Sequence, residues 1–553
     1  MILRNIFPRW LALALLFGSA LATAQTAASP EARTERAFTA AKKAGAPELY
    51  AFLKLFPKGA DLHMHLSGAV YAETFIAEAV KAGLCIAAVD PGTPATPVPE
   101  GAVRFVPSIT GKDAPCGPGR VPASDALKNQ KLYDALVDSF SMRGFVPSPG
   151  ITGHDQFFST FDRFGGLKNV QGEWLDEVAS RAAAQNEQYL EIMNTPSFSN
   201  TAAAGYKIGF VIGLNDENHM RELAKLRDAL LANGLRDDIA IDVEEFATAQ
   251  RKRRIIEGCE TDADAAAKNL SERHGIPETG YEPRCGVSIH FLYQVLRGFP
   301  PQQVFAQTLL GFEVASADPD VVGINFVMPE DGRISMQDYH RQMLMLDYLH
   351  SVYPKVHISL HAGELAPGMV APDGLRFHIR EAIDLGHAER IGHGVDVLYE
   401  NDPQALLKEM AAKHIMVEVN LTSNDAILGI KGTDHPLAAY RAAHVPFALS
   451  TDDEGVSRID LTHEYVRAAL EQNLTYADLK QSARTSLEHS FLPGASLWTS
   501  PDNFTHRVSA CATPINTSTK ISASCTAFLG SSERAAQQWE LERRFAAFEA
   551  TPH

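Results

Sequence analysis

Apolar residues in this chain gather in short runs separated by stretches of helical periodicity. Eight runs have the length and residue types of buried strands, at 59–65, 188–193, 286–293, 320–327, 356–360, 389–393, 415–419 and 445–450. Between most of them apolar residues recur at helical spacing, as in 71–82, 217–232, 335–353 and 377–385. This alternation predicts an α/β protein, and eight strand–helix units predict a (β/α)8 TIM barrel.

Interruptions in this pattern indicate how the chain is divided. Residues 90–124 are rich in Pro, Gly and Ala, which is typical of a surface excursion. The stretch 238–243 fits either a further strand or part of an insertion. We therefore expect a linker and helix at 25–58, a barrel at 59–490 with insertions at about 83–124 and 245–285, and an extension with a closing helix at 491–553.

The first 24 residues have the features of an export signal. Arg4 and Arg9 give a basic start, and the apolar run 11–21 is too short to cross a bilayer comfortably. The small residues Ala22 and Ala24 form the pattern that precedes signal-peptidase cleavage. We expect residues 1–24 to be a signal peptide and the mature protein to be periplasmic or extracellular, without a membrane anchor.

Charge narrows the range of partners. The 553 residues include 67 acids and 50 bases, for a net charge of −17. The basic run at 251–254 is most simply a solvated helix face. We therefore expect no binding of nucleic acid, while a small ligand without phosphate stays open.

The six cysteines lie in three local pairs. Each pair would close a short loop in or beside a polar or Gly/Pro/Ser/Thr-rich stretch, where a disulfide compensates for poor burial. We expect the pairs to be Cys85 with Cys116, Cys259 with Cys285, and Cys511 with Cys525, although other connectivities are open.

Residues that can bind a metal or transfer a proton stand at the ends of four expected strands. They are His63 and His65 on the first, His361 and Glu364 at the fifth, His393 on the sixth, and Asp452 and Asp453 after the eighth. The two histidines of the first strand are two positions apart, so both point to one face. Active sites of such barrels lie at the carboxyl ends of the strands, so we expect these side chains to converge.

Three imidazoles and one carboxylate of this set form a candidate zinc site. One Zn2+ per chain would be held by His63, His65, His361 and Asp452, with a position left for water. Water in such a site ionises near neutral pH and becomes a nucleophile. Glu364 is placed for proton transfer to a substrate, His393 for orienting or deprotonating the water, and Asp453 for a hydrogen bond to the substrate.

The residues around these positions resemble the signatures of the adenosine deaminase family, in the amidohydrolase superfamily. The matching stretches are H-M-H-L-S-G-A from His63, S-L-H-A-G-E from Ser359, R-I-G-H-G from Arg390 and S-T-D-D from Ser450. The export signal, the insertion after the first strand and the local cysteines are more similar to the secreted adenosine deaminase growth factor branch than to the compact cytosolic enzyme.

This resemblance implies a mononuclear zinc enzyme of the metal-dependent hydrolase type. It would convert adenosine or 2′-deoxyadenosine to inosine or 2′-deoxyinosine and ammonia, so its partner is a purine nucleoside. Glu364 would protonate purine N1 while hydroxide attacks C6, His393 would orient the hydroxide, and Asp453 would hold the hydroxyl or N7. The oligomeric state is left open, with a homodimer as one option.

Two positions depart from the family pattern. Ser67 stands where the family commonly has an acidic or amide residue, and Met328 where it often has a glycine. Both positions are expected to contact the substrate, so both bear on the sugar preference rather than on deamination.

Other functions remain open on the same scaffold. Adenine or a modified adenosine could replace adenosine, whereas AMP is disfavoured because no basic cluster accompanies the strand ends. A secreted binding or signalling module would use the barrel without catalysis, and the complete residue set argues against it. A metal-dependent esterase or amidase would use the same water, but Glu364 would then have no ring nitrogen to protonate.

Overall fold

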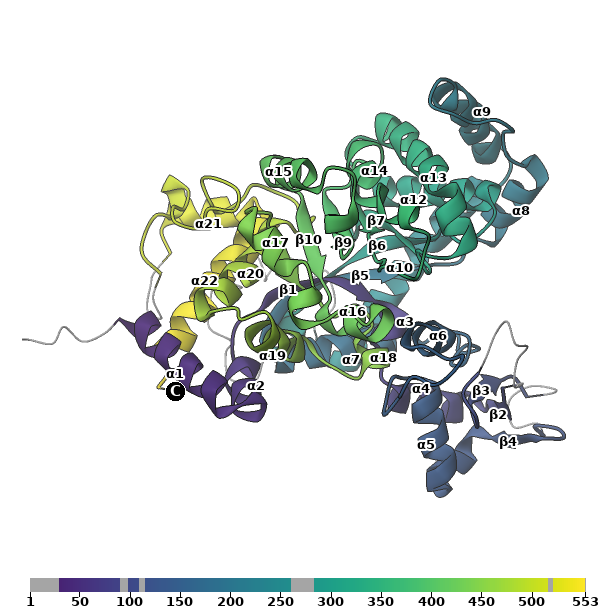
Figure 1. The fold of residues 1–553 in the computed structure, drawn as a ribbon, viewed down its shortest axis with the longest axis horizontal. Coiled ribbons are helices and arrows are strands. Elements are labelled where there is room, and N and C mark those ends of the chain that lie inside the picture. Colours follow the sequence, from purple (N-terminus) through teal and green to yellow (C-terminus); the bar gives the residue numbers. More distant parts are fainter. Residues whose placement is uncertain (1–28, 90–97, 109–114, 260–282, 516–520, 553) are drawn as a thin grey trace, which may run out of the picture.

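Eight parallel strands form the centre of the protein, and helices surround them (Figure 1). The computed structural model describes residues 29–89, 98–108, 115–259, 283–515 and 521–552. Neighbouring strands pair in chain order: β1 (Gly59–His65), β5 (Glu187–Asn194), β6 (Ser288–Leu296), β7 (Val321–Val327), β8 (His357–Ala362), β9 (Arg390–His393), β10 (Met416–Val419) and β11 (Phe447–Leu449). Asp452 N donates to His63 O (2.8 Å) and His65 N to Asp452 O (3.2 Å), which joins the last strand to the first. The predicted TIM barrel is confirmed.

Helices of the barrel lie between and after these strands. They are α7 (Gln171–Ala184), α8 (Ser199–Ile208), α9 (His219–Leu231), α10 (Leu235–Glu257), α12 (Pro301–Ala317), α13 (Arg333–Val352), α14 (His378–Asp384), α15 (Pro403–Lys413), α16 (Leu421–Leu428), α17 (Leu437–Ala442), α18 (Glu454–Ser457), α19 (Leu461–Glu471) and α20 (Tyr476–Glu488). Helix α12 is deeply placed, with buried residues on most of its surface. In the described residues, no helix has both the length and the apolar character needed to cross a membrane.

A separate lobe follows β1. It contains α3 (Leu66–Ala69), α4 (Ala72–Ala82), α5 (Gln130–Ser139), α6 (Gly153–Ser159) and an antiparallel sheet of β2 (Cys85–Ala88), β3 (Val103–Val106) and β4 (Arg120–Pro122). Its core is aromatic: the rings of Phe75 and Phe164 stack at 4.4 Å, and Phe140 packs edge-on against Phe105 at 4.8 Å. The lobe therefore extends beyond the cysteine-bearing stretch to the helices that complete its core.

The stretch 238–243 is helix rather than strand, which corrects one of the two alternatives. It lies inside the 23-residue helix α10. The alternation of isoleucines and acids suggested a strand, but the buried face of this helix carries polar side chains: Asp238 accepts from Thr201 N (2.6 Å) and Asp242 from Tyr293 Oη (3.1 Å). The apolar Ile241 is exposed instead. Specific hydrogen bonds thus override the local hydrophobic pattern.

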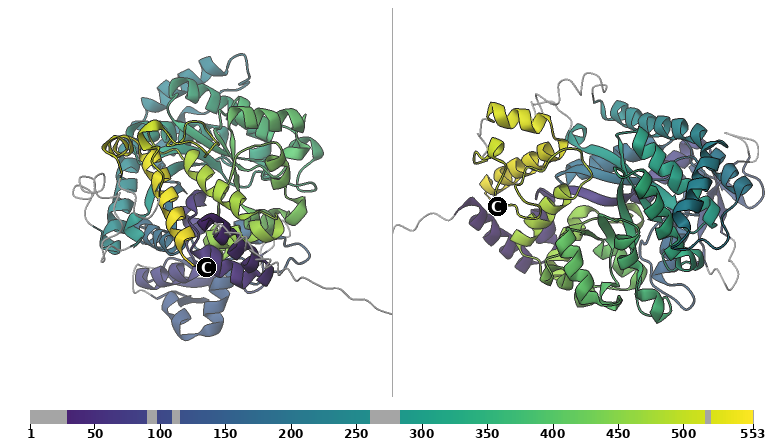
Figure 2. Two further views of the ribbon diagram at one scale, coloured as in Figure 1. Left: turned by 90° about the vertical axis from the view of Figure 1, so that its left-hand side faces the viewer. Right: turned by 90° about the horizontal axis from the view of Figure 1, so that it is seen from above.

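The two ends of the described chain meet beside the barrel (Figure 2). Helices α1 (Pro30–Ala44) and α2 (Ala46–Lys54) pack near the final helix α22 (Glu533–Ala550) through an aromatic cluster. Phe56 lies 5.5 Å from Phe545 and 5.9 Å from Phe548, measured between ring centroids. The terminal extensions therefore share one core with the barrel. The expected signal peptide, residues 1–24, lies outside the described residues.

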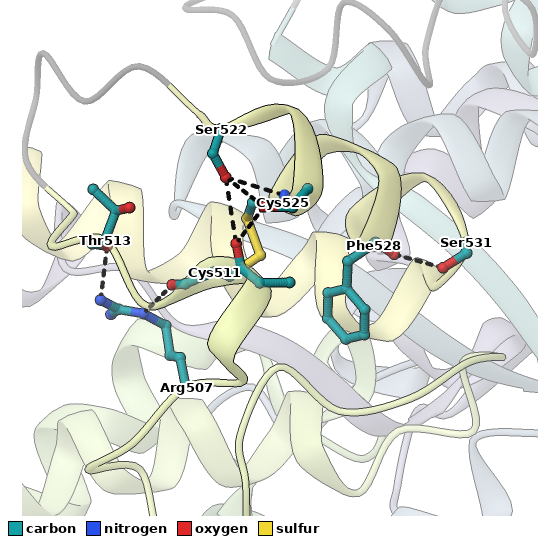
Figure 3. Close-up of a disulfide and its surroundings, with 9 residues drawn as sticks. Arg507, Cys511, Thr513, Ser522, Cys525, Phe528 and Ser531 are labelled. Carbon is teal, nitrogen blue, oxygen red and sulfur yellow. Dashed lines mark hydrogen bonds between the residues drawn. A yellow bond between two sulfur atoms is a disulfide. The ribbon is translucent and has the colours of Figure 1, made fainter.

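All three expected disulfides are present, joining Cys85 to Cys116, Cys259 to Cys285 and Cys511 to Cys525. The last pair ties the short helix α21 (Ala523–Gly530) to the preceding segment, where Arg507 donates to the Cys511 carbonyl (Figure 3). Each bridge closes a local loop, as the sequence predicts.

Candidate metal centre and active site

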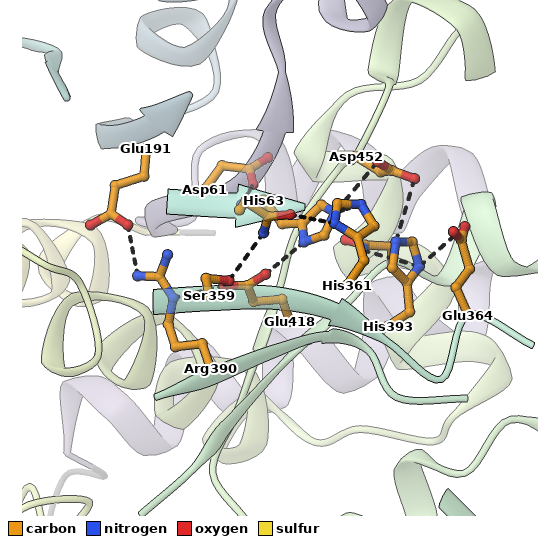
Figure 4. Close-up of polar contacts among 12 residues, drawn as sticks. Asp61, His63, Glu191, Ser359, His361, Glu364, Arg390, His393, Glu418 and Asp452 are labelled. Carbon is orange, nitrogen blue, oxygen red and sulfur yellow. Dashed lines mark hydrogen bonds and ion pairs between the residues drawn. The ribbon is translucent and has the colours of Figure 1, made fainter. Parts of the chain in front are cut away.

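One buried cluster at the carboxyl end of the barrel contains the predicted chemistry (Figure 4). Its first group has one ligand atom from each member within 4.8 Å of the others, and consists of His63, His65, His361 and Asp452. Its second group meets the same criterion and consists of Glu364, His393 and Asp452. Each of these side chains belongs to a residue that is at most 8% exposed. Four separate strand ends thus converge as the sequence predicts.

Hydrogen bonds turn three imidazoles toward a common point. Each ring donates through Nδ1: His63 to Glu418 (2.6 Å), His65 to Gln294 (2.8 Å) and His361 to Asn325 (2.6 Å). A neutral imidazole carries one proton, so each Nε2 is left with a lone pair. Carboxylate and amide partners of this kind orient metal-binding histidines.

The lone pairs face one another at close range. The Nε2 atoms of His63 and His361 are 3.2 Å apart, and Asp452 Oδ1 is 3.1 Å from His65 Nε2. With the Nδ1 protons committed elsewhere, no proton remains between the two facing nitrogens, so their arrangement suits a shared cation. Three nitrogens and one carboxylate oxygen are a typical donor set for zinc. The residues present therefore fit the metal that the family resemblance implies.

Glu364 is held in place through hydrogen bonds from its backbone and that of Gly363 to Glu330. Glu330, which is buried, accepts from Gly363 N (3.0 Å) and Glu364 N (2.8 Å), and receives a short bond from His378 Nδ1 (2.5 Å). Gly363 has φ +77°, which permits the turn between the metal-facing His361 and Glu364. Burial, and then the charges of Asp452 and Glu330, raise the pKa of Glu364 well above its usual value. This carboxyl group therefore favours the protonated form.

His393 reaches the cluster from the end of β9. A side chain at the preceding Gly392 would place its Cβ 2.5 Å from His63 Cε1, so only glycine allows the strand to lie so close. His393 Nε2 points toward Asp452 Oδ2 at 4.0 Å. Burial lowers the pKa of His393 to about 3, which leaves a neutral ring.

Asp453 stands beside the ligand Asp452 and against the short helix α3. A Cβ at Gly68 would lie 1.5 Å from Asp453 Oδ1, so the missing side chain of Gly68 makes room for this carboxyl group. Within the described residues, Asp453 Oδ1 has no hydrogen-bond partner. Burial, and then the charge of Asp452, raise the pKa of Asp453 to about 8. This oxygen is available to a ligand.

The two remaining predicted residues lie at the edge of the cluster. Ser67 is half-buried in α3, directly after His65 and Leu66. Met328 follows β7 with φ +87°, and its side chain packs over Gly298, since a Cβ there would lie 2.8 Å from Met328 Cε. Their contacts with a substrate remain predictions.

The partners that orient the cluster were not predicted from sequence. They are Gln294, Asn325, Glu330, Glu418 and Asn424. Three of them are polar residues inside strands: Gln294 in β6, and Asn325 and Glu418 in the more apolar strands β7 and β10. That pattern was the available signal, because a buried polar group on a strand needs a partner.

Comparison with known proteins finds similarity to one family over part of the chain. A model described as adenosine deaminase matches residues 275–497. Adenosine deaminases of Escherichia coli (strain SE11) and Salmonella heidelberg (strain SL476) are 36% and 38% identical to the chain over 137 residues. Over this region the chain is similar to adenosine deaminases. The aligned stretch is 25% of this chain and 38% of the length of each of these relatives.

The solved structures to which the chain is similar are more distant in sequence. The N6-mAMP deaminase of arabidopsis is 18% identical, with a TM-score of 0.47 over 80% of this chain and 96% of that one. A cog1816 amidohydrolase from Burkhoderia ambifaria, with bound Zn, is 14% identical, with a TM-score of 0.46 over 91% of this chain and 95% of that one. The similarity to adenosine deaminases therefore rests on the sequence match over part of the chain.

Proposed function

We propose that this protein is a member of the adenosine deaminase family and a zinc-dependent aminohydrolase of adenosine and 2′-deoxyadenosine. The products would be inosine or 2′-deoxyinosine and ammonia. The observation that carries the proposal is the convergence of three imidazole lone pairs and Asp452 with the buried acid Glu364. An esterase or amidase would not need that acid beside the metal ligands.

The donor set would hold one zinc ion through His63, His65, His361 and Asp452. When bound, zinc supplies a Lewis acid that makes water nucleophilic near neutral pH. Glu364, which favours its protonated form, would donate that proton to purine N1 and so make C6 more electrophilic. The unpartnered Asp453 Oδ1 would take a hydrogen bond with the purine or the attacking hydroxyl. The buried setting strengthens these electrostatic contacts.

The test is the ultraviolet absorbance of adenosine with zinc-loaded protein, before and after treatment with a chelator. We expect a fall in absorbance at the adenosine maximum that the chelator abolishes and added zinc restores. Adenosine, 2′-deoxyadenosine, adenine and an N6-modified adenosine would be compared in parallel. Turnover of adenine or the modified nucleoside alone would change the substrate assignment, and no release of ammonia, or of the substituted amine from the modified nucleoside, would overturn the proposed activity.

We also propose that the protein is exported after removal of residues 1–24, as in a secreted branch of the family. The three disulfides are in keeping with an oxidising compartment. N-terminal sequencing of protein recovered from the periplasm or medium should begin just after Ala24. Recovery of the full-length chain from the cytoplasm alone would contradict export.

A further inference from the structure

A chain of hydrogen bonds behind the active site ends on His393. Leu437 N, at the start of α17, donates to His435 Nδ1 (3.2 Å). His435 Nε2 lies 3.1 Å from Asn424 Oδ1, and Asn424 Nδ2 lies 2.9 Å from His393 Nδ1. The three side chains are fully or almost fully buried, so no competing bond to bulk solvent is expected.

The backbone N–H of Leu437 determines which atom donates in each hydrogen bond of this series. An amide N–H only donates, so His435 Nδ1 must be the unprotonated nitrogen of that ring. Its proton is then on Nε2 and is donated to Asn424 Oδ1. The amide of Asn424 is thereby fixed with its NH2 group toward His393, and an NH2 group also only donates. His393 Nδ1 accepts, which leaves the proton of this ring on Nε2.

Two other groups approach His393 Nδ1. Asn420 Nδ2 is 3.5 Å away, and as an amide NH2 group it also favours an accepting nitrogen. Glu364 Oε1 is 3.6 Å away, beyond hydrogen-bond range and farther than Asn424. The closest contact therefore decides the position of the proton.

His393 is thus the opposite of the three candidate ligands. His63, His65 and His361 carry their proton on Nδ1 and present a lone pair to the centre. His393 presents an N–H at Nε2, and this atom has no hydrogen-bond partner within the described residues. A donor is therefore aimed into the cluster without an acceptor from the protein.

We propose that Asn424 and His435 are positioning residues that hold His393 as an Nε2–H donor, so that His393 orients the attacking oxygen rather than removing its proton. The role of His393 rests on the proposed deamination in one respect: the oxygen that accepts its hydrogen bond is the one that would attack the substrate. The position of the proton on His393 does not depend on turnover.

The direct test is nuclear magnetic resonance of zinc-loaded protein with 15N-labelled histidine rings. Long-range 1H–15N correlations distinguish a protonated ring nitrogen from an unprotonated one, and the signals of His393 are those lost in His393→Gln. We expect Nδ1 of His393 to be unprotonated and Nε2 protonated. The reverse arrangement in the wild-type protein would overturn the proposal.

Variants of the hydrogen-bonded series from His435 through Asn424 to His393, here called the relay, extend the test. Asn424→Asp replaces the NH2 donor by a carboxylate of the same shape, which should draw the proton of His393 to Nδ1. We expect kcat to fall about 100-fold, the effect of losing one donor to a reacting oxygen, with little change in KM. An unchanged His393 spectrum in the folded variant would contradict the relay.

His435 offers an independent pair of variants. His435→Gln keeps an N–H that can reach Asn424 Oδ1 and should preserve the His393 spectrum. His435→Leu removes that donor, so His393 should become a mixture of its Nδ1–H and Nε2–H forms. Ser423→Ala, a buried neighbour in α16 outside the relay, is the matched control and should change neither the spectrum nor kcat. If His435→Leu retains a single Nε2–H form, His435 has no such role. Normal spectra combined with failed deamination would instead remove the proposed function and leave the relay in place.

Discussion

Two buried polar clusters lie inside the barrel, and they differ in how their charges are balanced (Figure 4). Toward the amino end, Arg390 lies between Glu191 and Glu418, at 2.7 Å from each carboxylate, with its guanidinium 3.8 Å from the centroid of the Phe491 ring. At the carboxyl end, lone pairs of His63 and His361 face each other beside Asp452. The protein completes the first cluster with its own cation, while the second is arranged for one from outside.

Glu418 connects the two clusters. One of its oxygens accepts from His63 Nδ1, and the other pairs with Arg390 and accepts from Ser359 Oγ (2.9 Å). Burial of charge alone is therefore a poor marker of function, since both clusters are buried. The distinguishing feature is the source of the charge balance. Arg390 pairs with Glu191 and Glu418 in the first cluster, whereas the second gathers candidate metal ligands around a common point, and in the described part of the chain Asp453 Oδ1 and His393 Nε2 have no hydrogen-bond partner.

The largest effect is expected from removing the cation of the amino-end cluster. Arg390→Met leaves Glu191 and Glu418 as uncompensated buried carboxylates, a change that costs about 3–5 kcal/mol of stability. Urea unfolding followed by circular dichroism measures the loss. Arg390→Lys keeps a charge without the planar fork and should lose less. An unfolding midpoint of Arg390→Met equal to that of the wild type would refute the structural reading of this cluster.

At the carboxyl end the corresponding change should affect rate rather than stability. Glu364→Gln preserves the shape of the side chain but removes its proton, so kcat should fall by at least about 100-fold, the contribution of a general acid. Zinc content, measured by atomic absorption, should be unchanged because Glu364 is not among the four candidate ligands. Near-normal turnover of Glu364→Gln would contradict the role of Glu364 as a general acid. A lower zinc content in the variant would mean that Glu364 acts through the metal.

The sequence allowed the carboxyl-end residues to be predicted because each stands at or just after a strand end, as in His63-Met64-His65. Their position relative to the strand is a local property, and the barrel topology then brings the ends together. The partner of each imidazole lies on a different strand: His65 and Gln294, for example, are brought together only by the register of β1, β5 and β6. Such pairings are long-range and have no local pattern. The full extent of helix α10 was not predicted for a related reason, since its buried face mixes polar side chains such as Asp238 and Asp242 with apolar ones.

Removing the hydrogen-bond partner of a single candidate metal ligand should have a smaller effect, confined to metal affinity. Gln294→Ala removes the acceptor that orients His65, and the zinc affinity should fall about 10- to 100-fold. Competition with a chromogenic chelator measures the change. Gln294→Glu keeps an acceptor oxygen and should retain most of the affinity. If both variants bind zinc as the wild type does, the orientation of His65 does not depend on this bond.

The smallest effect concerns a buried acid that belongs to neither cluster. Asp242 on α10 accepts from Tyr293 through one oxygen, and burial raises its pKa to about 8. In the unfolded chain the pKa of an aspartate is about 4. The folded protein therefore binds this proton more tightly, and the stability it contributes is fully present below about pH 4 and is lost as pH rises through about 8.

Asp242→Asn removes this titration, so between pH 6 and pH 9 its melting temperature should decline less than that of the wild type. Melting curves across that range, followed by circular dichroism, measure the difference. Asp237→Asn, an exposed acid on the same helix, is the control and should follow the wild type. Parallel curves for all three proteins would show that Asp242 does not hold a proton in the folded state. A divergence limited to Asp242→Asn, with zinc binding unchanged, would show that an isolated buried acid affects stability without contributing to the metal centre.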